Sequence, residues 1–202
     1  DIFFDKDYKK QIKKDLYDKY PMLKGKKVIL FAPTFRGNDI HKAYYDFSQI
    51  HFSSLQQSLD EDYVCIIKLH PFIKNKYQET LDPQFYIDLT SMREINDLLF
   101  ITDILITDYS SVIFDYYFTH KPIIYFAYDL DEYTGYGGRG LYFDFYDYVY
   151  GAIATTTSQL IEDIQKREMY DEKRQVFYQK FLSACDGQST KKSCEWIFKE
   201  SA

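Results

Sequence analysis

A short apolar strand that runs directly into a cluster of hydroxyl side chains is the feature that most constrains this chain. Residues 103–107 read Asp-Ile-Leu-Ile-Thr, and Asp108, Tyr109, Ser110 and Ser111 follow before a segment with helical spacing. The first N–H groups of a helix lack partners and the helix dipole favours negative charge, so an anion binds where a strand meets a helix start. The pattern predicts a phosphate or pyrophosphate site on the two serines; the simpler interpretation is that they only cap the helix.

Strand and helix patterns alternate along the chain, which predicts a parallel sheet with helices on both faces. The predicted strands are 27–32, 63–69, 85–89, 104–107 and 122–127, and the predicted helices are 6–19, 48–59, 92–100 (capped by Thr90 or Ser91), 111–119, 157–166, 170–184 and 190–200. Residues 129–150 are predicted to form a long glycine-rich and aromatic loop. The fold class is therefore α/β, a Rossmann-like sheet in a single domain over 1–202, and polar residues at the carboxyl ends of its strands are expected to converge.

Charge and cysteine content narrow the class of protein. The net charge of −6 argues against general affinity for nucleic acid. Residues 1–27 hold nine lysines against five aspartates, which indicates either a solvated helix face or contact with an anionic membrane surface or polymer. No segment resembles a signal peptide, and no apolar run approaches the roughly 18 residues that span a bilayer. Three scattered cysteines suit a reducing compartment, so we expect a cytoplasmic protein.

Side chains that can act on a phosphate follow the other predicted strands. His70 ends one strand, where a neutral imidazole can act as a base and an imidazolium can neutralise a departing phosphate; a purely structural histidine is the alternative. Lys68 faces either the same region or solvent. Arg36 and Arg139 lie in glycine-flanked loops, and a guanidinium group is suited to bidentate contact with phosphate.

The acidic residues near these positions admit two interpretations each. Asp115 lies one helical turn past the serines and either accepts hydrogen bonds from ribose hydroxyls or forms a surface ion pair. Asp129 and Asp131 form a D-x-D pattern of the kind found in metal-dependent sugar-nucleotide transferases, but so short a pattern is frequent by chance, and we predict neither a metal nor a cofactor. The glycine-rich dinucleotide, P-loop, H-E-x-x-H and G-x-S-x-G motifs are missing from the sequence, which weakens the oxidoreductase, ATPase and hydrolase classes.

Seven blocks, taken in order, resemble one family, the CDP-glycerol:poly(glycerophosphate) glycerophosphotransferases, which are teichoic-acid primases and polymerases of Gram-positive bacteria with their capsule relatives. The blocks are residues 29–36, 67–71, 103–111, 121–124, 129–133, 139–140 and 186–187. The resemblance implies one half of a GT-B architecture, the carboxyl-terminal half that binds the CDP-alditol donor. The amino-terminal half, with the acceptor surface and a further histidine, would then be a partner outside this chain, toward which the helical ends 1–20 and 170–202 would pack.

The resemblance also implies roles for individual residues. His70 would be catalytic, and the donor-binding residues would be Arg36, Lys68, Thr107, Asp108, Ser110, Ser111, Asp115, Arg139, Asp186 and Gly187. The parent enzyme would move glycerol phosphate or ribitol phosphate from CDP-glycerol or CDP-ribitol to a hydroxyl of a lipid-linked cell-wall or capsule polymer, release CMP, and sit peripherally at the inner face of the membrane. Where relatives have a Pro-Gly-Pro turn, this chain has Tyr150-Gly151-Ala152. The alternatives are a GT-B glycosyltransferase that uses a UDP- or GDP-sugar and a non-catalytic nucleotide-binding module.

Overall fold

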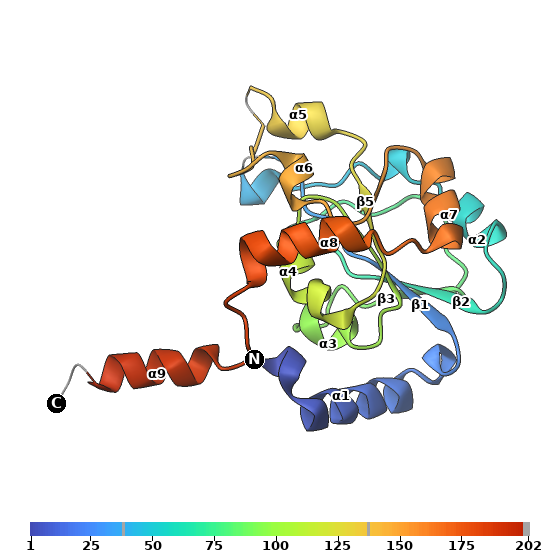
Figure 1. The fold of residues 1–202 in the computed structure, drawn as a ribbon. Coiled ribbons are helices and arrows are strands. Elements are labelled where there is room, and N and C mark those ends of the chain that lie inside the picture. Colours follow the sequence, from blue (N-terminus) through green and yellow to red (C-terminus); the bar gives the residue numbers. More distant parts are fainter. Residues whose placement is uncertain (38, 137, 200–202) are drawn as a thin grey trace.

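A six-stranded parallel sheet in the order β3-β2-β1-β4-β5-β6 runs through the centre of the computed structural model (Figure 1), which describes residues 1–37, 39–136 and 138–199. Its strands are β1 (Lys27–Phe31), β2 (Tyr63–Ile67), β3 (Tyr86–Asp88), β4 (Ile104–Thr107), β5 (Ile123–Phe126) and β6 (Ala152–Ala154). Each neighbouring pair is parallel. The strand order reverses between β1 and β4, which makes their carboxyl ends the switch point of a doubly wound sheet. The α/β fold class and the five predicted strands are confirmed.

Helices cover both faces of this sheet because its strands are apolar on both sides. Successive strand residues point to opposite faces, so Leu30 and Leu105 enter one buried cluster while Ile29 and Ile106 enter the other. The first face carries α1 (Lys6–Lys19), α3 (Ile95–Leu99), α4 (Val112–Tyr116) and α8 (Asp171–Phe177), and the second carries α2 (Phe52–Gln57) and α7 (Thr157–Lys166).

Two of the longer predicted helices, 6–19 and 157–166, are confirmed, and the structure adds a side-chain cap at the start of each. The Asp5 carboxylate accepts the N–H groups of Asp7 and Tyr8 at the start of α1, and the Thr156 hydroxyl accepts the N–H of Gln159 at the start of α7. The last helix, α9 (Ser189–Lys199), projects away from the body of the molecule in Figure 1. The end of the predicted helix 190–200 and the domain boundary at 202 lie outside the described residues. No described helix is both long enough and apolar enough to cross a membrane.

Three helices differ from their predicted bounds. The segment predicted as 48–59 begins with the 3-10 turn Phe47–Gln49, and α2 starts only at Phe52. Thr90 does not cap the next helix, because its hydroxyl accepts the N–H of Leu69 at 3.1 Å, and α3 starts after Glu94. The helix predicted as 111–119 is α4 followed by a 3-10 turn over Tyr117–Thr119.

The segment predicted as one long loop, 129–150, contains two short helices, α5 (Leu130–Thr134) and α6 (Phe145–Tyr148). After it, β6 is a strand that the prediction missed, because three residues are too few to show a period. A Cβ on Gly151 would lie 2.1 Å from the carbonyl oxygen of Ile123, so only glycine lets the chain approach β5 closely enough to pair with it. The final predicted helix pair consists of α8, continued by a wider turn over Tyr178–Leu182, and α9.

Candidate functional site

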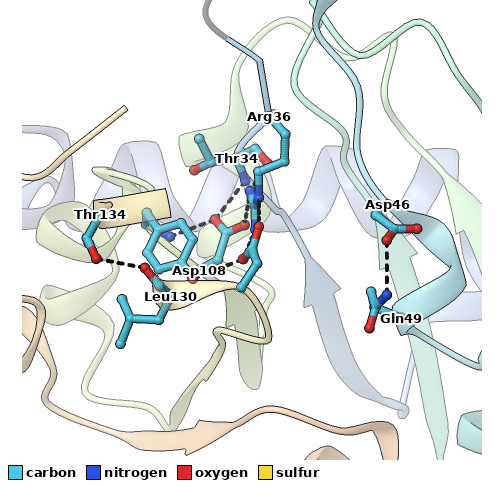
Figure 2. A network of polar contacts seen from close by, with 9 residues as sticks. Thr34, Arg36, Asp46, Gln49, Asp108, Leu130 and Thr134 are labelled. Atoms are coloured by element: carbon cyan, nitrogen blue, oxygen red, sulfur yellow. Dashed lines mark hydrogen bonds and ion pairs between the residues drawn. The ribbon is translucent and has the colours of Figure 1, made fainter. Parts of the chain in front are cut away.

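Arg36 joins the carboxyl ends of three strands from inside the molecule. It follows β1, and its Nη1 donates to Asp108 Oδ2 after β4 at 2.8 Å and to the Thr34 carbonyl oxygen at 2.7 Å (Figure 2). Its Nη2 donates to Asp129 Oδ1 after β5 at 2.9 Å, and its Nε donates to the other oxygen of the same carboxylate. The two ion pairs therefore fix the relative positions of the loops that follow β1, β4 and β5.

The environment of Arg36 keeps its charge fixed and away from solvent. The residue is 6% exposed, and four tyrosine rings surround its guanidinium carbon at 5.1 to 5.4 Å, those of Tyr45, Tyr109, Tyr128 and Tyr133. Burial opposes the charge, but attraction to Asp108 and the bond with Asp129 together raise the pKa of Arg36. Four of the five N–H donors of the guanidinium group serve two carboxylates and a carbonyl oxygen. Arg36 therefore orders the loops around the site, and its predicted contact with a donor phosphate stays a prediction.

Thr107, Asp108 and Lys68 are also turned inward. The Thr107 hydroxyl donates to the Ala32 carbonyl oxygen at 2.8 Å and ties β4 to β1. Asp108 is 1% exposed and accepts the N–H groups of Thr34 and Tyr109 in addition to Arg36; burial raises its pKa, while Arg36 and Thr34 oppose that rise. Lys68 Nζ donates to the Thr90 carbonyl oxygen at 3.1 Å, on the β3 side of the sheet. In this structure the side chains of these three residues form internal contacts, and their predicted roles in donor binding stay predictions.

The turn that carries Ser110 and Ser111 keeps free donors at the surface. Ser110 is half-buried and Ser111 is exposed. The Ser110 Oγ accepts the N–H of Val112 at 3.3 Å, which leaves its own hydroxyl hydrogen available, and the side chain of Ser111 caps nothing. In the part of the chain that the structure describes, the N–H groups of both serines lack a protein acceptor. Two hydroxyls and two backbone N–H groups therefore remain for an anion.

A cavity of about 600 Å³ opens directly over this turn. Its lining combines the serine turn, Arg139 and an aromatic wall. The lining residues are Asp108, Tyr109, Ser110, Ser111, Ile113, Phe114, Tyr125, Tyr133, Arg139, Gly140, Leu141, Tyr142, Phe145 and Tyr148. Polar donors together with flat rings in one lining are the features of a pocket for a phosphorylated ligand that also carries a ring.

Arg139 and His70 meet at a third residue, Phe35. The Arg139 guanidinium carbon lies 4.0 Å from the centre of the Phe35 ring, and Arg139 Nη1 donates to the Gly37 carbonyl oxygen at 3.4 Å. The His70 ring lies 4.8 Å from the same phenyl ring and 4.8 Å from that of Phe72. The loops after β1 and β2 and the segment after α5 are thus brought together, as the predicted convergence of strand ends requires.

The hydrogen bonding of His70 defines its chemistry. Its Nδ1 accepts the N–H of Phe72 at 3.2 Å, which assigns the proton of the neutral ring to Nε2. Burial, followed by the charges of Arg139 and Lys68, lowers the pKa of His70, so the ring is neutral at neutral pH. In this tautomer Nε2–H is a hydrogen-bond donor, which suits stabilisation of a negatively charged oxygen better than removal of a proton.

Three further predicted site residues do not line the cavity. None of the described residues that line the cavity is Asp115, Asp186 or Gly187. The Asp186 carboxylate is exposed and bonds Lys192 Nζ at 2.6 Å. A Cβ on Gly187 would meet the Phe4 ring at 2.6 Å, which places this turn against the amino-terminal end of the chain. Asp115 lies on α4 one turn past Ser111 without lining the cavity, and Asp186 and Gly187 are not part of the cavity lining either.

The sequence reasoning missed the aromatic wall and the role of Asp129. Tyr109 stacks on Tyr133 with ring centres 3.9 Å apart, and its hydroxyl donates to Asp129 at 3.0 Å. The sequence pattern of Asp129 indicates a metal motif or a family block, whereas in the structure this residue is the partner of Arg36. Across residues 1–37, 39–136 and 138–199, no three His, Cys, Asp or Glu side chains group closely enough to hold a metal ion. The 21 tyrosines of the sequence are a signal for such a wall, but they follow no regular spacing that would show which of them line a pocket.

The fold and the cavity define the class: a Rossmann-like domain whose ligand pocket opens at the carboxyl edge of a doubly wound sheet. Residues 1–199 match the sequence profile of the CDP-Glycerol:Poly(glycerophosphate) glycerophosphotransferase family. The chain therefore belongs to this family, as its sequence blocks predicted.

Named relatives and solved structures agree with this assignment. The chain is 42% identical over 98% of its length to a teichoic acid poly(ribitol-phosphate) polymerase of Bacillus spizizenii, and covers 32% of that protein. It is 39% identical over 86% of its length to a teichoic acid glycerol-phosphate transferase of Staphylococcus aureus, and covers 46% of it. A variant of the wall teichoic acid polymerase TagF soaked with CDPG superposes with a TM-score of 0.79 at 29% identity, over 98% of this chain and 49% of that one. The chain thus spans between about a third and a half of these proteins.

Proposed function

We propose that this chain is the donor-binding part of a transferase that moves glycerol phosphate or ribitol phosphate from its CDP ester to a hydroxyl of a lipid-linked cell-wall or capsule polymer. The observation that carries the proposal is the cavity over Ser110 and Ser111, where unpartnered donors and Arg139 adjoin an aromatic wall. A CDP-alditol carries two phosphates and a flat pyrimidine ring, which match the polar donors and the aromatic rings of this lining.

The reaction requires an in-line displacement at the phosphorus that bears the alditol. The acceptor hydroxyl oxygen forms a new P–O bond and loses its proton, while the bridging P–O bond breaks and CMP leaves with the electron pair. Negative charge grows on the bridging oxygen. The donors of Ser110 and Ser111, the Arg139 guanidinium and Nε2–H of His70 are the groups of this chain suited to stabilise that charge.

The relatives support both alditols, since a ribitol-phosphate polymerase and a glycerol-phosphate transferase are similar to this chain. In the proposal, a second Rossmann-like half of GT-B type supplies the acceptor surface and the base that removes the acceptor proton. His70 is poorly suited to that second role because its Nδ1 already accepts a hydrogen bond. The helical ends of the chain are the surfaces proposed to meet this partner.

Isothermal titration of residues 1–202 with CDP-glycerol, CDP-ribitol, UDP-glucose and GDP-mannose tests the donor class. We expect binding of at least one CDP-alditol and a loss of about tenfold in affinity for the double variant S110A/S111A, because two charge-assisted hydrogen bonds disappear. The matched control is S54A, whose serine is exposed on α2 on the other face of the sheet. Preference for a nucleotide sugar, or equal affinity of the two variants, would reject the proposal.

Peripheral attachment at the inner face of the membrane is the proposed location. Lys6, Lys10 and Lys14 of α1 are exposed and recur every four residues, so they form one basic stripe, and Phe4, just before the helix, is also exposed. Sedimentation with phosphatidylglycerol vesicles checks this location. Wild-type binding should exceed that of K6E/K10E/K14E, and equal sedimentation of the two proteins would remove the role of α1.

A further inference from the structure

Phe35 lies between the two loops that carry His70 and Arg139, and no function is yet assigned to it. The residue follows β1 directly before Arg36 and is 7% exposed. Its ring contacts the Arg139 guanidinium at 4.0 Å and the His70 ring at 4.8 Å. These contacts join segments that are far apart in the sequence, at residues 35, 70 and 139.

The two contacts differ in kind, and together they fix a geometry. A guanidinium group at 4.0 Å from a ring centre is a cation–π contact, which holds the plane of Arg139 over the phenyl face. The His70 ring is inclined by 45° to Phe35 and also packs against Phe72. Arg139 is exposed, so without this platform its long side chain would sample many rotamers.

We propose that Phe35 is a positioning residue, which holds the Arg139 guanidinium and the His70 imidazole side by side so that one anionic group can contact both. The phenyl ring itself contacts no substrate. Its contribution is preorganisation: the two polar groups are ordered before the ligand arrives, and the ligand does not bear that entropy cost. The role in donor binding rests on the proposed function, whereas the juxtaposition of the two side chains does not.

The proximity of Arg139 to His70 can be measured without a ligand, because a nearby positive charge makes the histidine ring harder to protonate. Arg139 and Lys68 are the charged groups that act in this way on His70. NMR titration of the His70 ring in residues 1–202 therefore reports whether Arg139 stays close. We expect R139Q to raise the pKa of His70, and F35L to raise it by at least half as much, because the guanidinium loses its platform.

Phe72 offers a matched control for the loss of a ring. Its ring lies 4.8 Å from that of the same histidine and 5.6 Å from that of Phe35, but among the described residues it makes no cation–π contact with Arg139. F72L should therefore shift the pKa of His70 less than F35L does. In the double variant F35L/R139Q, the shift should not exceed that of R139Q alone, because the charge is already gone. Equal shifts in F35L and F72L, or full additivity in the double variant, would overturn the proposal.

Two further measurements keep the test decisive. If F35L does not fold, nuclear Overhauser contacts between the Phe35 ring protons and the Arg139 side chain in the wild type decide the matter, and their absence overturns the proposal.

The second measurement is donor affinity. F35L should lower CDP-alditol affinity by nearly the factor that R139Q does, about tenfold. If the wild type binds no CDP-alditol, the proposed function fails while the NMR result stands. If S110A/S111A and R139Q weaken binding but F35L does not, the positioning role fails alone.

Discussion

Two arginines that occupy similar glycine-flanked loops have opposite environments in this fold. Arg36 is buried and bonded to the carboxylates of Asp108 and Asp129. Arg139 is exposed, rests on the Phe35 ring and lines the cavity over the serine turn. The difference separates two tasks: one guanidinium orders the strand ends, and the other is available to an anionic ligand. Variants of the two residues should therefore affect different measurements.

The largest expected effect is the loss of stability in R36Q. Without the guanidinium, the buried Asp108 and the half-buried Asp129 lose their cation, which costs about 3–5 kcal/mol. R139Q removes an exposed charge and should change stability by less than about 0.5 kcal/mol. Urea unfolding followed by circular dichroism measures both. Equal midpoints for the two variants would abolish the distinction between them.

The second largest expected effect concerns ligand affinity, and it is expected at Arg139. R139Q should weaken CDP-alditol binding about tenfold, and the wild-type affinity should fall as salt rises because the contact is solvent-exposed. R93Q is the control, since the Arg93 side chain is 94% exposed and lies outside the cavity lining. Calorimetry at two salt concentrations makes the comparison. A drop of the same size in R93Q would show that the effect is one of general charge.

A smaller effect is expected when one hydroxyl is removed beside Arg36. Y109F loses the hydrogen bond from Tyr109 to Asp129 and should cost about 1 kcal/mol of stability. Y86F loses a bond of similar kind, from the Tyr86 hydroxyl to the Phe52 carbonyl oxygen, on the other face of the sheet. Both variants should unfold at similar urea concentrations, but only Y109F should also weaken donor binding, because the lost bond to Asp129 orients a ring that lines the cavity. Unaltered donor affinity in Y109F would show that the Tyr109 hydroxyl contributes to stability but not to donor binding.

The smallest expected effect is a pH dependence that originates at His70. Burial and the charge of Arg139 lower the pKa of this residue below its ordinary value of 6.5. Between its folded pKa and 6.5 the unfolded chain binds more protons, so this group makes stability fall as pH falls through that window. The slope of the unfolding free energy against pH should decrease in H70Q. An identical slope in wild type and H70Q would show that the pKa of His70 is not displaced.

The serine turn illustrates how far local reasoning reaches. The strand 104–107, the hydroxyl cluster and the helix after it were predictable, because each rests on near neighbours in the sequence. The cap of α3 was not, because the Thr90 hydroxyl bonds Leu69, a residue brought near only by the pairing of β2 with β3. The strand β6 was also missed, since Gly151 matters only through its approach to β5.

The amino-acid sequence alone determined the alternation of elements, and hence that Ser110, Ser111, His70 and Arg139 would gather at one edge of a parallel sheet. The hydrophobic period and the direction of each strand depend on neighbouring residues, so they can be recognised in the sequence alone. Only the tertiary structure decided which charges are buried: Arg36 lies inside because β1 pairs with β4, β4 pairs with β5, and an aspartate follows the end of each of these two partner strands. Burial depends on what the rest of the chain packs around a residue, and that information belongs to no short stretch of sequence.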